Sequence, residues 1–370
     1  MRVVMFYQSL ISDWNHGNAH FLRGIVAELL SRGYAVDVYE PANSWSVENL
    51  LREHGSDPIS KFQTAFPQLS STRYDAKTLD LDRVLDNAHL VLVHEWNEPE
   101  LIEKIGKYAR RSRTFKLLFH DTHHRVASAD RLDFSLDGYD GVLAYGAVIA
   151  DKYLRRSWTN RAWTWHEAAD VRVFRPLPET ERVDDLVWIG NWGDEERTHE
   201  LRQFLLEPAK ALRLRGSVYG VRYPCEAITE IEQAGLRYRG WLANHRVPEA
   251  FARARVTLHI PRAPYVQALP GIPTIRVFEA LACGIPLICS PWTDTEGLFR
   301  SGEDFLLAHD GDEMKALLLD VLNDRVLAEE LAVNGLATVL ERHTCAHRVD
   351  ELLGIYGELT SIGERQMAIA

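Results

Sequence analysis

The sequence predicts two α/β domains, each built on a parallel β-sheet with helices on both faces. Three observations lead to this fold class. The chain has 370 residues and is 46% apolar, and single α/β domains usually stop growing well before this length. Short apolar runs alternate with helical patterns, which is typical of βαβ units. The alternation breaks once, between Phe174 and Asp185, and then starts again.

The first half of the chain is expected to form the first sheet. Its strands are predicted at 3–7, 35–40, 90–94, 116–120 and 141–145. Each run ends at a polar loop, and a helical pattern such as 21–32 follows most of them. Ligands of parallel sheets bind beyond the carboxyl ends of the strands, so functional side chains are expected in these loops.

The break in the pattern holds two prolines and six charged residues, so we place an interdomain linker at 175–185. It separates a first domain, 1–174, from a second domain, 186–345, and one option for the helix predicted at 346–370 is to pack back on the first domain. Two such domains leave a cleft, which is a favoured place for ligands. Strands of the second domain are predicted at 186–189, 217–219, 255–260 and 286–289.

Composition and charge exclude several classes of function. The net charge of -11 opposes a nucleic-acid partner, because phosphate backbones are bound by clustered Lys and Arg. No stretch of about 18 uncharged apolar residues is present, so no transmembrane segment is expected. The sequence opens directly on a strand-like run, and we therefore expect a cytoplasmic protein.

The most informative segment runs from Thr274 to Ser290, where a helix carrying a glutamate leads into a Gly-x-Pro turn and a buried strand. A helix N-terminus offers free N–H groups and partial positive charge to a diphosphate, and Glu279 can accept hydrogen bonds from ribose hydroxyls. Arg276 lies one turn earlier on the same helix face. It can reach a phosphate or simply pair with Glu279, and the sequence leaves both options open.

A second candidate lies after the first strand of the second domain, where Gly190 and Asn191 begin a glycine-containing loop that ends at Arg197. Glycine lets the backbone approach a diphosphate, and an arginine can neutralise a leaving group. The alternative is a turn that only closes a strand–helix connection.

In the first domain, the loop after the first strand holds His16, Asn18 and His20. Histidine titrates near neutral pH, which suits proton transfer from an acceptor hydroxyl. His16 is the preferred base because it precedes Gly17 in the loop, whereas His20 is expected to face inward on the helix. The alternative is that these residues cap the helix and bind water.

Polar residues also follow the next two strands. Glu95 and Asn97 follow one, and His120, Asp121 and His123 follow the other. Glu95 and Asp121 are further candidate bases, and the sequence does not choose between them and His16. The remaining three, together with Asn18 and His20, are expected to line an acceptor site.

A metal site is not expected from these histidines, because adjacent ligands do not converge as i, i+4 ligands on a helix do. Asp80 and Asp310 each belong to an Asp-x-Asp pattern at the start of a helical run. We interpret both as helix caps rather than metal ligands.

The segment from Thr274 to Ser290 resembles the donor-binding signature of GT-B glycosyltransferases of the group 1 superfamily, and more narrowly the CgeB-like, spore-maturation branch. The resemblance covers most of the second domain and is weaker in the first. It implies that Glu279 binds the donor ribose, and that Trp241 and Leu242 hold the base. The first glutamate of the family's Glu-x7-Glu pair falls on Gly271. The loop would instead present the N–H groups of Gly271, Ile272 and Thr274.

The resemblance implies a glycosyltransferase that moves a sugar from a nucleotide-diphosphate sugar, most commonly a UDP-sugar, to a hydroxyl acceptor. No cofactor and no tightly bound metal are expected. Replacement of the first glutamate leaves retention or inversion of the sugar open. Two alternatives remain, which are a nucleotide-sugar epimerase and a non-catalytic nucleotide-sugar-binding protein.

Overall fold

The computed structural model describes residues 1–112, 114–193 and 195–369. It divides into two compact units, Met1–Glu167 together with Cys345–Ala370, and Ala168–Thr344. The chain therefore leaves the first unit after Glu167 and returns to it at Cys345.

The first unit is built on a parallel sheet with the strand order β3-β2-β1-β4-β5-β6-β7. The central strand β4 has the sequence LVLVH, and all of its residues are buried. Such a continuous apolar run is typical of a strand that is covered on both faces. The strands are β1 (Arg2–Phe6), β2 (Ala35–Pro41), β3 (Thr72–Tyr74), β4 (Leu90–His94), β5 (Lys116–Asp121), β6 (Gly141–Ala144) and β7 (Ala162–Thr164).

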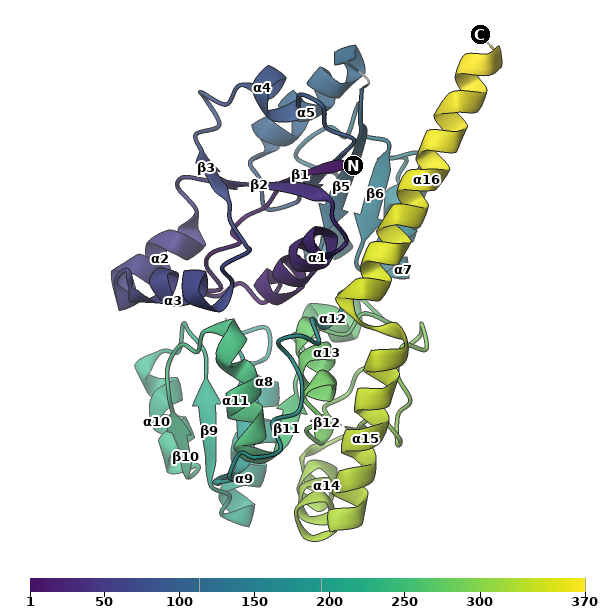
Figure 1. Ribbon diagram of the computed structural model, residues 1–370. Helices are drawn as coiled ribbons and strands as arrows, with labels where there is room; N and C mark the ends of the chain where they lie inside the picture. The colour runs from purple at the N-terminus through teal and green to yellow at the C-terminus, as the bar shows by residue number, and fades with distance from the viewer. Residues whose placement is uncertain (113, 194, 370) are drawn as a thin grey trace. The chain divides into compact units, whose positions relative to one another are not determined.

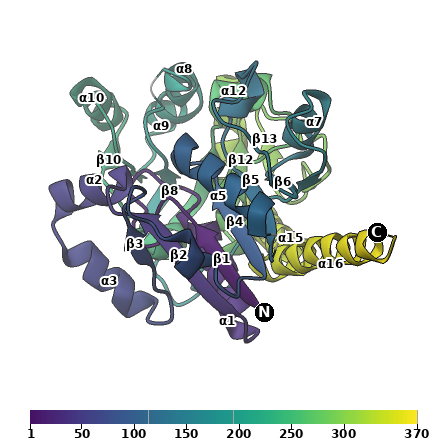
Figure 2. The ribbon, with the colours of Figure 1, turned by 90° about the horizontal axis from the view of Figure 1, so that it is seen from above.

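The last helix, α16, lies beside β6 of the first unit in Figure 1, and Figure 2 shows β2, β1 and β4 of the same sheet in succession. The Trp165 indole donates to the Arg348 carbonyl at 2.8 Å, and that of Trp163 donates to the Glu358 carboxylate at 3.3 Å. These bonds attach α16 to the end of the sheet. The helices of this unit are α1 (Ala19–Ser31), α2 (Trp45–His54), α3 (Asp57–Ala65), α4 (Leu81–Leu85), α5 (Pro99–Ser112), α6 (Arg125–Ser128), α7 (Ala147–Arg155) and α16 (Cys345–Ile369).

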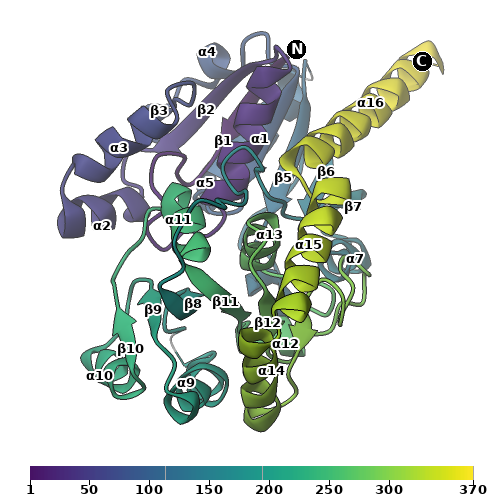
Figure 3. The same ribbon diagram turned by 60° about the horizontal axis from the view of Figure 1, so that its bottom comes forward.

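The second unit is built on a parallel sheet with the strand order β10-β9-β8-β11-β12-β13. Its strands are β8 (Asp184–Ile189), β9 (Gly216–Tyr219), β10 (Leu236–Tyr238), β11 (Ala254–His259), β12 (Leu287–Cys289) and β13 (Leu306–Leu307). Figure 3 shows α10 at the β10 edge and α14 beside β12. The helical segments are α8 (Thr198–Leu201), the π-helix η1 (Arg202–Leu206), α9 (Glu207–Leu212), α10 (Cys225–Gln233), the 3₁₀-helix η2 (Asn244–Arg246), α11 (Val247–Ala252), α12 (Ala263–Gln267), α13 (Ile275–Ala282), α14 (Gly311–Asn323) and α15 (Arg325–Arg342).

Both sheets have the same strand order when each is numbered from its own first strand, 3-2-1-4-5-6, with one further strand in the first unit. This is the order of the Rossmann fold. The connection reverses direction between β1 and β4 in the first unit, and between β8 and β11 in the second. Ligands of such sheets bind at this switch point, beyond the carboxyl ends of the strands.

The strands predicted from the longer apolar runs are all present. Asp80 and Asp310 are helix caps, as predicted, since each carboxylate accepts two backbone N–H bonds at the start of its helix, α4 or α14. Among the described residues, no helix combines the length and the apolar character needed to cross a membrane.

Candidate functional site

At the switch point of the second unit, two arginines meet on one asparagine. Arg197, after β8, donates to the Asn191 carbonyl and side-chain oxygens at 2.7 and 2.6 Å and to the Ile260 carbonyl at 3.1 Å. Arg262, after β11, donates to the same Asn191 side-chain oxygen at 3.0 Å and to Glu196 at 2.7 Å. The loops that follow the two switch-point strands are therefore joined by guanidinium groups.

Positive charge is concentrated at this point. Burial, together with the charges of Arg262 and Arg276, lowers the pKa of Arg197 to about 10. The Arg197 guanidinium lies over the Trp188 ring at 5.2 Å, and its Nε has no hydrogen-bond partner in the part of the chain that the structure describes. Arginines held close together in this way can bind an anion.

Helix α13 places Glu279 and Arg276 on one face. Glu279 is fully buried, and its carboxylate accepts from Asn244 at 2.9 Å and from Arg276. Of the two options for Arg276, the structure has the ion pair. A carboxylate oxygen can accept more than one hydrogen bond. The ribose contact of Glu279 stays a prediction.

The loop before α13 is more closed than the sequence suggested. The N–H groups of Gly271 and Ile272 donate to backbone carbonyls at 2.8 and 3.2 Å, and Thr274 is the N-cap of α13. Gly271 has φ +88°, and a Cβ atom there would lie 2.6 Å from the Thr295 hydroxyl. This position therefore requires glycine. A donor contact through Gly271 and Ile272 stays a prediction that would need their backbone bonds to be exchanged.

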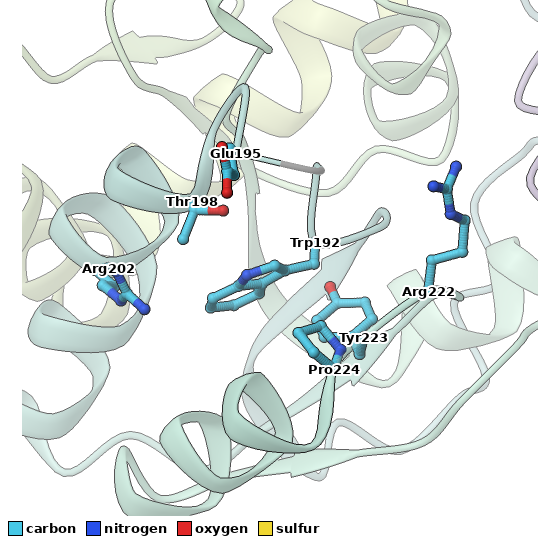
Figure 4. A pocket seen from close by; sticks show the side chains of 7 residues that line it. All are labelled: Trp192, Glu195, Thr198, Arg202, Arg222, Tyr223 and Pro224. Atoms are coloured by element: carbon cyan, nitrogen blue, oxygen red, sulfur yellow. The ribbon is translucent and has the colours of Figure 1, made fainter.

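The predicted base-binding residues, Trp241 and Leu242, are half-buried and follow β10. Their loop is joined to the loop after β9 by a bond from the Gly220 N–H to the Gly240 carbonyl at 2.8 Å. A hollow of about 730 Å³ lies between residues that follow β8 and β9, and neither Trp241 nor Leu242 lines it. Figure 4 shows Trp192 and Tyr223 at its wall.

In the first unit, His16 lies in the loop between β1 and α1 and is 6% exposed. Burial lowers its pKa to about 4, assisted by the charge of Arg23. The ring bonds to the Ser9 backbone, and Nε2 has no partner among the described residues. The tautomer that donates its proton to Ser9 leaves the Nε2 lone pair available, which is the form a general base needs.

Glu95 and Asp121 lie at the ends of the neighbouring strands β4 and β5. Thr122 donates to Glu95 through its N–H at 2.8 Å and its hydroxyl at 3.1 Å, and Tyr153 donates to Asp121 at 2.8 Å. Burial raises the pKa of both carboxyl groups, and the charge of Asp121 raises that of Glu95 further. The Arg125 guanidinium donates to the Glu95 carboxylate at 3.3 Å, and its charge opposes this rise in the pKa of Glu95.

His120 is fully buried, with its ring against those of Trp165 at 4.8 Å and His94 at 5.3 Å. Burial lowers its pKa to about 3. His94 is also buried, and burial together with the charge of His120 lowers its pKa. The three predicted bases and His120 therefore belong to one group at the carboxyl ends of β1, β4 and β5.

The other predicted acceptor residues occupy different settings. Asn97 donates both side-chain N–H groups to backbone carbonyls and accepts from a tyrosine hydroxyl, so it ties strands together. His20 is buried on α1, Asn18 is the N-cap of that helix, and His123 stacks on its neighbour His124 at 4.1 Å. Their acceptor contacts stay predictions.

Sequence reasoning did not select three residues that the structure places in the second-unit site, namely Arg262, Asn244 and His259. His259 is the last residue of β11 and Arg262 follows it. Because β11 was a predicted strand, the rule that sites lie beyond strand ends could have selected both residues. Asn244 had no such signal, because its bond to Glu279 spans 35 residues.

No group of three or more His, Cys, Asp or Glu residues has an arrangement suited to a metal ion within 1–112, 114–193 and 195–369.

Comparison with known proteins gives a family-model match for part of the chain. Residues 197–354 match a family model described as glycosyl transferase-like. No curated protein matches the chain in sequence. The matched segment includes Arg197, Arg262 and Glu279, and it agrees with the predicted enzyme class.

Solved structures match over nearly the whole chain. A sucrose-phosphate synthase from Thermosynechococcus elongatus is 14% identical, with a TM-score of 0.67 over 98% of this chain and 100% of that one. HepE of Anabaena, solved with UDP and glucose, is 13% identical, with a TM-score of 0.66 over 96% and 99%. An alpha-glucosyltransferase solved with UDP-glucose and DNA is 12% identical, with a TM-score of 0.70 over 96% and 99%.

These neighbours confirm the predicted fold class, a GT-B fold with two Rossmann-like parallel sheets. Membership of the GT-B superfamily stays a prediction, because the family model matches residues 197–354, which is less than half of the chain. The CgeB-like branch stays a prediction, as does the absence of a nucleic-acid partner.

Proposed function

We propose that this protein is a glycosyltransferase that moves a sugar from a nucleotide-diphosphate sugar, UDP-sugar in the first instance, to a hydroxyl acceptor. The observation that carries the proposal is the cluster of Arg197, Arg262 and Arg276 at the switch point of the unit that matches the glycosyl transferase-like model. A leaving nucleoside diphosphate needs its charge neutralised. Arg197 would supply positive charge for this without a tightly bound metal, and Arg262 and Arg276 would add to it by exchanging their carboxylate partners Glu196 and Glu279 for phosphate oxygens.

In the proposed donor site, the diphosphate lies against the three arginines, the ribose near Glu279, and the base near Trp241 and Leu242. UDP is the first choice because HepE was solved with UDP and the alpha-glucosyltransferase with UDP-glucose.

In the proposed acceptor site, His16 is the base. The acceptor oxygen attacks the anomeric carbon, the bond from that carbon to the phosphate oxygen breaks, and the diphosphate leaves with the electron pair. The acceptor proton passes to Nε2 of His16, the nitrogen that has no partner in the described structure. Such a single displacement inverts the anomeric carbon.

The test is a thermal-shift panel of UDP, GDP, ADP and CMP, with and without magnesium. A ligand that binds only the folded state raises the melting temperature. We expect one nucleoside diphosphate to give a shift without magnesium, and Glu279→Gln to reduce it. Silence across the panel would contradict the proposal.

An epimerase is a second candidate, because the buried carboxyl pair Glu95–Asp121 is the kind of acid–base pair that epimerisation needs. Incubating the donor without an acceptor separates the two reactions. An isomeric sugar nucleotide in the NMR spectrum would indicate epimerisation, and an unchanged donor supports the transferase.

A further inference from the structure

His259 ends β11 at the switch point of the second unit and is 2% exposed. Neither Nδ1 nor Nε2 of its ring has a hydrogen-bond partner among the residues that the structure describes. A neutral imidazole carries one N–H donor and one acceptor nitrogen. Buried polar groups are nearly always hydrogen-bonded, so two unmet nitrogens on one ring need an explanation.

The surroundings of His259 are those of the proposed diphosphate site. The charges of Arg197 and Arg276 both act on the ring and, with burial, lower its pKa to about 3. The next residue along the chain, Ile260, accepts a bond from Arg197 at 3.1 Å. The ring also meets Trp292 nearly at right angles, with 6.1 Å between centroids. It is therefore fixed in place as an uncharged group beside cationic ones.

We propose that His259 is a diphosphate-binding residue, and that its ring N–H donates a hydrogen bond to a phosphate oxygen of the nucleoside diphosphate. The inference rests on the proposed function. The arginines supply the charge that the anion needs, and a neutral N–H donor adds a directed bond. Bound diphosphate would thus satisfy a buried ring that has no hydrogen-bond partner among the described residues.

His343 provides a matched control in the same unit. It is 3% exposed, its Nε2 bonds to the Leu298 carbonyl at 2.8 Å, and its ring packs on Phe299 at 4.9 Å. Its polar group is satisfied within the protein, so it has a structural role. The two histidines should therefore respond in opposite ways to the same substitution.

The experiment compares His259→Leu with His343→Leu. Melting temperatures are measured without ligand, and affinities for the nucleoside diphosphate that binds the wild type are measured by calorimetry. We expect His259→Leu to keep or raise the melting temperature and to weaken binding about 10-fold to 100-fold, the range for a hydrogen bond to a charged group. We expect His343→Leu to melt lower, because the Leu298 carbonyl loses its donor, and to keep its affinity.

Two further measurements identify the group that His259 contacts. Asn and Gln carry amide N–H groups near the positions of Nδ1 and Nε2, so His259→Asn or His259→Gln should restore part of the affinity. His259→Leu should weaken the binding of inorganic pyrophosphate as well. A loss confined to nucleoside diphosphates, or no rescue by either amide, would overturn the phosphate contact.

The outcomes separate this inference from the proposed function. If the wild type binds none of the nucleoside diphosphates, both fail. If the wild type binds and Glu279→Gln weakens binding while His259→Leu does not, only the role of His259 fails.

Discussion

The switch point between β1 and β4 in the first unit and the one between β8 and β11 in the second unit have the same topology and opposite chemistry. The first gathers neutral histidines and carboxyl groups with raised pKa. The second gathers guanidinium groups around Asn191. One place in the fold is thus suited to moving a proton and the other to holding an anion, as the proposed transferase with separate acceptor and donor sites requires.

The largest effect is expected from His16→Ala in the first unit. Removal of a general base typically lowers the rate about 10²-fold to 10⁴-fold, so kcat should fall in this range. Affinity for the nucleoside diphosphate should stay at the wild-type value, because the proposed donor site lies in the other unit. Transfer is followed with a labelled donor, and binding by calorimetry.

His54→Ala is the control for this prediction, since His54 belongs to the same unit and its side chain is 34% exposed. It should keep wild-type kcat. A product with retained anomeric configuration, or unchanged kcat in His16→Ala, would contradict the assignment of His16 as the general base.

The second unit should respond through binding. Arg197→Ala removes a buried guanidinium from the proposed anion site, and we expect nucleoside diphosphate affinity to fall about 100-fold by calorimetry. Arg325→Ala removes the same charge from α15, where the side chain is 91% exposed, and should bind like the wild type. Equal losses in both variants would mean that overall charge, rather than the switch-point cluster, attracts the ligand.

The pH dependence of kcat should tell which group at the first switch point is the base. The pKa of His16 is lowered to about 4, so this base stays unprotonated and kcat should be flat between pH 8 and 5.5. A carboxyl base from the Glu95–Asp121 pair would instead lose activity as pH falls through neutrality, because burial raises both pKa values.

Glu95→Gln should accordingly change kcat by about tenfold or less, which is below the usual effect of a lost general base. In the pH series, each sample is returned to pH 7.5 and should recover full activity, which shows that a loss of activity at low pH comes from titration and not from unfolding. An acid limb near neutrality that Glu95→Gln abolishes would transfer the base role to Glu95.

The comparison of the two switch points also explains what the sequence could predict. Long apolar runs predicted the central strands, and the rule about strand ends then selected His16, Glu95, Asp121 and Arg197. The short strands β3, β7 and β13 were missed, since edge strands of two or three residues carry little pattern.

Contacts between loops that are far apart in the chain were also beyond the sequence. Arg262 and Asn191 are 71 residues apart, and no local period relates them. The Gly271 N–H likewise donates to the Thr293 carbonyl, which lies in the loop after β12. Residue types therefore identified candidate sites, whereas their hydrogen-bond partners required the fold.

The smallest expected effect is on stability. It concerns how the buried His120 makes the free energy of unfolding depend on pH. In the folded protein the pKa of His120 is about 3, whereas an unfolded chain has a histidine pKa near 6.5. The unfolded state therefore binds the extra proton below pH 6.5, and the folded state loses stability as pH falls.

His120→Phe removes the titrating imidazole and keeps an aromatic ring against Trp165 and Phe21. Denaturant unfolding at pH 7.5 and 5.5 should show that the acid loss in free energy of unfolding shrinks by about 1.4 kcal/mol. An unchanged loss would mean that His120 is charged in the folded protein, and the first switch point would then share the cationic character of the second.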